Sequence, residues 1–70
     1  MAGETEQTNL LGHVDVEDPL NRERKLSIGV RGSRVALVLP PGEGLSMSPA
    51  VGRRLVAHLR EAIRIAESEP

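Results

Sequence analysis

The chain has 70 residues, of which 39% are hydrophobic and none is aromatic, and its formal net charge is −1. A chain of this length forms one small domain with a marginal core, and because it lacks cysteine it has neither disulfides nor thiolate metal ligands to support that core. The near-neutral charge and the absence of aromatic side chains argue against a nucleic-acid-binding protein with a strongly basic, base-stacking surface. Oligomerisation remains as a way to enlarge the core.

Residues 1–9 are polar and show no periodicity. We expect them to form a disordered tail, so that residues 10–70 make up a single small ββα or βββα domain. No apolar run is long enough to span a membrane, and no signal-peptide core follows Met1, so the expected compartment is the cytoplasm.

The first element in the chain is weakly marked. Val14 and Val16 alternate with polar residues, which permits a short strand that ends before Pro19. The acidic residues of DVED (15–18) are interpreted as a solubilising segment, with coordination of a cation or mimicry of phosphate charge as the alternatives. The stretch LNRERK (20–25) is expected to be a polar connector or at most one helical turn.

A β-hairpin is predicted in the segment KLSIGVRGSRVALVLPP (25–41). Its apolar residues alternate with small or polar ones on both sides of Gly32-Ser33, a pair typical of a two-residue type I′ or II′ loop. Two prolines then end the second strand. The loop length sets the register and places six apolar side chains on one face as the pairs Val30–Val35, Ile28–Leu37 and Leu26–Leu39.

A helix is predicted from Pro49 to about Ser68. Ser48 is a favourable N-cap and proline suits the first helical position. At about 100° per residue, one broad apolar stripe forms, bordered by Ile65 and His58, and Arg53, Arg60 and Arg64 lie on the opposite side. The residues of the stripe are Val51, Leu55, Val56, Leu59, Ala62, Ile63 and Ala66.

These elements predict an α+β fold, in which an antiparallel β-hairpin packs on one C-terminal α-helix, with or without a third N-terminal strand. A two-stranded ribbon is marginally stable and offers about three apolar pairs, fewer than the wide helical stripe needs. We therefore favour a homodimer formed through the helix, the ribbon or both. The alternative is a monomer in which the segment around Val14 and Val16 supplies a third strand. The residues assigned to the core and the dimer interface are Ile28, Val30, Val35, Leu37, Val51, Leu55, Leu59 and Ile63.

Catalytic and metal-binding patterns are missing from the sequence. It contains no nucleophile–base arrangement, no carboxylate pair suited to acid–base chemistry, and no metal-ligand set. The glycines of PPGEG (40–44) are not followed by the Lys-Ser/Thr pair of a phosphate-binding loop, so this segment is interpreted as a strand-to-helix connector. We expect a protein that is not an enzyme and needs no cofactor or metal.

Arginine side chains are the candidate partner-binding residues. Arg31 and Arg34 lie across the hairpin tip, where two like charges are unfavourable unless something binds them. Because the arginine fork binds carboxylates with two hydrogen bonds, we expect a protein partner at the tip first and at the row Arg53, Arg60 and Arg64 second. The favoured function is a non-enzymatic protein-binding module, a small phage-encoded or bacterial modulator that binds a host regulatory protein, for example a transcription regulator. The alternative is a small dimeric DNA-binding or nucleoid-associated accessory protein that uses the doubled arginine row.

Residues 34–66, RVALVLPPGEGLSMSPAVGRRLVAHLREAIRIA, resemble a segment of small actinobacterial and actinobacteriophage proteins. Eight of the nine basic residues are arginine, which is typical of a GC-rich genome. The ribbon-then-helix order also resembles the N-terminal dimerisation domain of the actinobacterial nucleoid-associated silencer. That resemblance implies a dimer, but this sequence lacks the Arg-Gly-Arg hook of that family's basic tail, so direct binding in a DNA groove is not expected from it.

Overall fold

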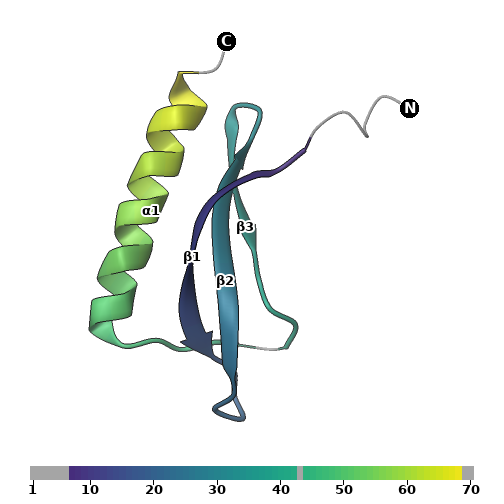
Figure 1. The fold of residues 1–70 in the computed structure, drawn as a ribbon, viewed down its shortest axis with the longest axis vertical. Coiled ribbons are helices and arrows are strands. Elements are labelled where there is room, and N and C mark those ends of the chain that lie inside the picture. Colours follow the sequence, from purple (N-terminus) through teal and green to yellow (C-terminus); the bar gives the residue numbers. More distant parts are fainter. Residues whose placement is uncertain (1–6, 43, 69–70) are drawn as a thin grey trace.

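The computed structural model describes residues 7–42 and 44–68, which form a three-stranded antiparallel sheet and one helix. The elements are β1 (Asn9–Glu17), β2 (Glu23–Arg31), β3 (Arg34–Val38) and α1 (Pro49–Glu67). The strands lie in the order β1-β2-β3, and α1 runs along one face of the sheet (Figure 1). The α+β prediction is confirmed in its form with a third N-terminal strand. Residues 1–6 of the predicted tail lie outside the described residues.

The β2–β3 hairpin has the predicted register over most of its length. Val30 lies opposite Val35 and Ile28 opposite Leu37. Gly32, the first loop residue, has a φ of 60°, as a type II′ turn requires. The predicted pairing of Leu26 with Leu39 is wrong, because the ladder ends at the pair Ser27–Val38 and the chain then leaves the sheet toward Pro40.

β1 is longer than the alternating segment predicted from the sequence. The pairing is irregular between Leu10 and Gly12, where β1 has one residue more than β2. Inward- and outward-facing residues therefore alternate regularly only after Gly12. β2 also begins earlier than predicted, which leaves residues 18–22 as the whole connection. In this connection the Asn21 N–H donates to the Asp18 carbonyl at 2.8 Å, and Asn21 has a φ of 62°. Asparagine is one of the few residues that adopts this backbone conformation readily.

The helix begins and ends as predicted. The Ser48 side chain accepts a hydrogen bond from the Val51 N–H at 3.2 Å, and Pro49 occupies the first turn. The cap at the other end is Ser68. Among the described residues, no helix has the length and apolar character that crossing a membrane would need.

The core lies between α1 and the face of the sheet that β1 and β2 share. Ile28 and Val16 are fully buried there. The segment before α1 closes one end, because Ser46 and Glu17 exchange two backbone hydrogen bonds of 2.9 Å. One cluster consists of Val14, Val16 and Leu26 with Leu45, Met47, Val51 and Leu55 around them, and the other of Ile28, Val30, Ala62 and Ala66 with Leu55, Leu59 and Ile65.

Candidate interaction surface

The helix contacts the sheet unevenly, and its two flanks differ. On one flank His58 packs against β1 so closely that a Cβ atom at Gly12 would lie 2.6 Å from the imidazole Cε1. Val56 and Ile63 lie on the other flank, beyond the buried line of Ala62 and Ala66, and each is 45% exposed. Because the strand order is β1-β2-β3, the flank that turns away from β1 lies on the side of β3.

β3 also carries apolar side chains that the described chain covers only in part. Val35 and Leu37 lie opposite Val30 and Ile28, so they share the helix-facing side of the sheet. Val30 and Ile28 are buried, whereas Val35 is 38% exposed and Leu37 48% exposed. Leu39, just after the strand, is 58% exposed. We call this area the β3–α1 surface, and its residues are Val35, Leu37, Leu39, Val56 and Ile63.

The residues that the sequence assigned to the core and the dimer interface therefore fall into two groups. Ile28 and Val30 are buried in β2, and three residues of α1 are half-buried against the core. These half-buried residues of the first group are Val51, Leu55 and Leu59. The second group, Val35, Leu37 and Ile63, belongs to the β3–α1 surface. Leu39 and Val56 also belong to this surface, and the predicted apolar pattern already marked both of them.

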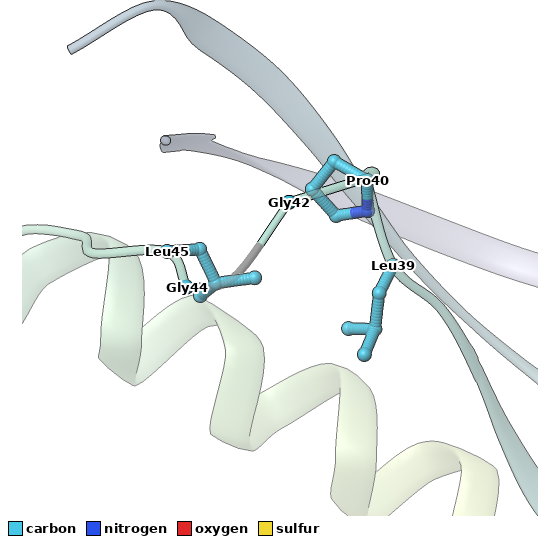
Figure 2. Close-up of a pocket in the computed structure, with 5 residues that line it drawn as sticks. All are labelled: Leu39, Pro40, Gly42, Gly44 and Leu45. Atoms are coloured by element: carbon cyan, nitrogen blue, oxygen red, sulfur yellow. The ribbon is translucent and has the colours of Figure 1, made fainter. Parts of the chain in front are cut away.

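A hollow of about 290 Å³ lies at the end of this surface, where the chain passes from β3 toward α1 (Figure 2). Leu39 and Leu45 stand on its two sides, and the Leu39 side chain is directed toward the helix. The remaining described lining is Pro40, Gly42 and Gly44, which offer no ionisable group. The lining is suited to an apolar side chain, and these residues offer no side-chain chemistry for catalysis.

A second hollow, of about 230 Å³, lies beside the hairpin tip and β3. It is lined by Arg31 and by four successive residues of the strand, Arg34 to Leu37. Arg31 and Arg34 lie opposite each other at the hairpin tip, and both are exposed. Arg31 donates to the Thr8 hydroxyl from Nε at 3.2 Å and from a terminal nitrogen at 3.1 Å. Within the described ranges, no acidic side chain pairs with either arginine.

The predicted arginine row on α1 is exposed but partly neutralised. Arg64 donates to Glu61 from Nε at 3.2 Å, and this hydrogen bond lowers the pKa of the Glu61 carboxyl. Arg53 and Arg60 are exposed and form no ion pair within the described part of the chain. The row therefore keeps two arginines without a described ion pair, the same number as the hairpin tip, where Arg31 and Arg34 lie directly opposite each other.

Asp18 differs from the solubilising role predicted for the segment DVED. Its carboxylate is buried and accepts hydrogen bonds from the backbone N–H groups of Leu20 and Arg22, each at 2.9 Å. Arg22 Nε also donates to it at 3.0 Å, and Arg24 Nε lies 3.5 Å away. The backbone hydrogen bond from Arg22 is the main cause that lowers the pKa of Asp18, against the opposing effect of burial. Asp18 thus fixes the β1–β2 turn.

Comparison with protein-family models, with curated proteins and with solved structures finds no match for this chain. The resemblance to small actinobacterial and phage proteins therefore stays a prediction. Among residues 7–42 and 44–68, no three histidine, aspartate or glutamate side chains come close enough together to hold a metal ion.

Proposed function

We propose that this protein is a non-enzymatic protein-binding module, of the kind that modulates a regulatory protein. The observation that supports the proposal is the hairpin tip, where Arg31 and Arg34 are both exposed and no described acidic side chain pairs with either. The β3–α1 surface adds five apolar side chains that stay between 38% and 58% exposed on a 70-residue chain. An uncovered apolar patch rimmed by polar residues is typical of a protein interaction site. The hairpin tip next to it carries Arg31 and Arg34 on the outer face of the sheet, and their planar guanidinium groups can each bind two oxygens of a partner's carboxylate.

The proposed partner contact is the hairpin tip. Arg31 and Arg34 carry two positive charges that no described acidic side chain neutralises, and Thr8 holds one of the two side chains in place. A side chain held in one orientation loses less conformational entropy when a partner binds. We therefore expect an acidic segment of the partner to contact the tip.

Affinity capture from cells of the source organism tests this function with a matched pair of variants. Arg31→Glu/Arg34→Glu reverses the tip, and Arg53→Glu/Arg60→Glu makes the same change of charge on the helix row. We expect the tip variant to retain its circular dichroism spectrum and to bind the captured partner more than tenfold more weakly, while the row variant binds as the wild type does.

Two outcomes would contradict the proposal. If the wild-type protein captures no protein that the tip variant loses, the tip is not a partner site. If it captures DNA with an affinity that falls steeply with salt, and the row variant loses that binding, the DNA-binding alternative is correct.

A further inference from the structure

We infer that the β3 edge is completed by a second copy of this chain, whose β3 pairs with it antiparallel and extends the two sheets into one of six strands. This inference rests on the proposed function, in which the partner protein binds at the hairpin tip. It assigns the β3–α1 surface to the second copy of the chain. It starts from a difference between the two edges of the sheet.

The β1 edge is protected against pairing. Near its start the pairing is irregular between Leu10 and Gly12, and irregularities of this kind twist an edge out of the geometry that another strand needs. At its end Glu17 already pairs with Ser46 through two backbone hydrogen bonds of 2.9 Å. A further strand therefore finds little of this edge available.

The β3 edge has neither form of protection, and its sequence is that of an interior strand. The five residues Val35 to Leu39 are all apolar, so both faces of the strand are apolar: Leu37 on the helix side is 48% exposed, and Val38 on the outer side is 50% exposed. Strands covered on both faces have such continuous apolar runs, whereas solvent-exposed edges normally carry charge or proline. In the strand order β1-β2-β3, no strand of the described residues pairs with the other side of β3.

The hairpin fixes which backbone groups of β3 are free. The residues that flank a two-residue loop, Arg31 and Arg34, form its hydrogen-bonded pair, and the pattern then alternates along the ladder. Val35 and Leu37 consequently direct their N–H and C=O groups away from β2. These are the same residues whose side chains belong to the β3–α1 surface, so one docking event satisfies the backbone and covers the apolar side chains.

A two-fold axis centred on Ala36 makes this pairing self-complementary. Each Val35 then lies opposite a Leu37 of the second copy, and each Arg34 lies opposite a Val38, so the two Arg34 charges do not oppose each other. The second β3 also places its apolar side chains beside the flank of Val56 and Ile63. The exposed fractions of 38–58% on the five residues amount to roughly 400 Å² of surface per copy, so the pair of copies, with the strand backbone and Val38 added, reaches about the 1,000 Å² that a specific interface needs.

Light scattering coupled to gel filtration, with refractive-index detection because the chain has no aromatic residues, measures the assembly directly. At a protein concentration of about 100 µM, a dimer with an interface of modest affinity should form. We expect twice the chain mass of 7.6 kDa and no larger species, because only the β3 edge of the sheet is open. Leu37→Lys places a charge on the edge and should give the monomer mass with an unchanged circular dichroism spectrum. Leu20→Lys, at a position 70% exposed in the β1–β2 turn, is the control and should stay dimeric.

A cysteine pair tests the register. In the proposed dimer Ala36 faces its own copy in a non-hydrogen-bonded pair, where the Cα atoms are about 4.5 Å apart and within the range of a disulfide. Ala36→Cys should therefore form a covalent dimer under mild oxidation, whereas Asp15→Cys, on the exposed outer face of β1, should not. Three results would each overturn the inference. These are a monomeric wild type, a dimeric Leu37→Lys variant, and a dimer in which Ala36→Cys forms the disulfide no faster than Asp15→Cys.

The inference and the proposed function fail in different measurements. A monomeric wild type that still captures a partner through the hairpin tip contradicts the dimer alone. A dimer that captures no partner contradicts the protein-binding function alone.

Discussion

Gly29 is the position where the structure makes the sharpest prediction about stability. It is buried in β2, opposite Leu10 on one side and Ala36 on the other. A Cβ atom at this position would lie 2.3 Å from the carbonyl oxygen of Asn9, whereas such contacts are essentially never shorter than 3.0 Å. The Asn9 backbone would have to retreat by at least the difference, 0.7 Å. Asn9 cannot move freely, because it is paired with Val30 in the same sheet.

The stability lost in Gly29→Ala depends on which kind of atom must move, and here it is a backbone atom. Displacing backbone in a packed site costs about 1–3 kcal/mol, and replacing glycine by alanine returns about 0.4–1 kcal/mol through the lower entropy of the unfolded chain. The middle of both ranges leaves a net loss of about 1–2 kcal/mol in the free energy of unfolding. Since about 1 kcal/mol shifts the melting temperature of a domain of this size by roughly 4–8 °C, Gly29→Ala should lower Tm by about 5–15 °C. Far-UV circular dichroism is the assay, because the chain has no aromatic residue to fluoresce.

Gly12→Ala is the matched control. A Cβ atom at Gly12 would lie 2.6 Å from Cε1 and 2.9 Å from Nδ1 of His58, which is a side chain that can change its rotamer. Gly12→Ala should therefore lower Tm by less than Gly29→Ala does. Adding His58→Ala should remove the steric part of the Gly12→Ala effect, whereas it should leave the effect of Gly29→Ala unchanged. The close approach of Asn9 to Gly29 would be refuted if Gly29→Ala melted at the wild-type temperature, or if His58→Ala rescued both variants equally.

Two further predictions concern the core and the β1–β2 turn. Ile28 has no exposed surface, so Ile28→Ala should destabilise the fold by about 2–5 kcal/mol, and a urea titration that shows no change would contradict its place in the core. Asp18 has its pKa lowered from 3.8 in the folded state, so its contribution to stability is complete above that value and is lost as the pH falls through the lowered pKa. Melting temperatures of wild type and Asp18→Asn should therefore differ at pH 6 and converge toward pH 2, and a difference that does not depend on pH would refute the ionised hydrogen-bonded carboxylate.

The hairpin and the helix were predictable because short-range rules determine them. The loop Gly32-Ser33 fixed the register of Val30 with Val35, and the positive φ of Gly32 is what the turn needs. Ser48 and Pro49 marked the helix start through capping chemistry that needs no tertiary contact. Alternation could not show where pairing stops, which is why Leu39 was included in the ladder although the strand ends at Val38.

β1 and Asp18 depend on contacts between segments, and their sequence signals are weaker. The irregularity between Leu10 and Gly12 interrupts the alternation by which a strand is recognised. Asp18 lies in a run of acids that suggests a solvated segment, yet the turn brings Arg22 and Arg24 to its carboxylate. The residues Asp-Pro-Leu-Asn are a turn signal that could have revealed this, because Pro19 suits the second position of a turn and Asn21 the left-handed conformation.

The width of the helical stripe links the fold to the proposed assembly. The sequence predicts two alternative ways to cover the part of the helical stripe that a two-stranded ribbon leaves exposed, namely a second copy of the chain or a third strand. In the structure β1 supplies the third strand, and it meets the helix on the flank of His58. Val56 and Ile63 lie on the flank toward β3, where β1 does not reach. The third strand β1 and the proposed second copy therefore cover opposite flanks of the helix. Because β1 leaves the flank of Val56 and Ile63 exposed, a second copy at the β3 edge still has an apolar surface to cover.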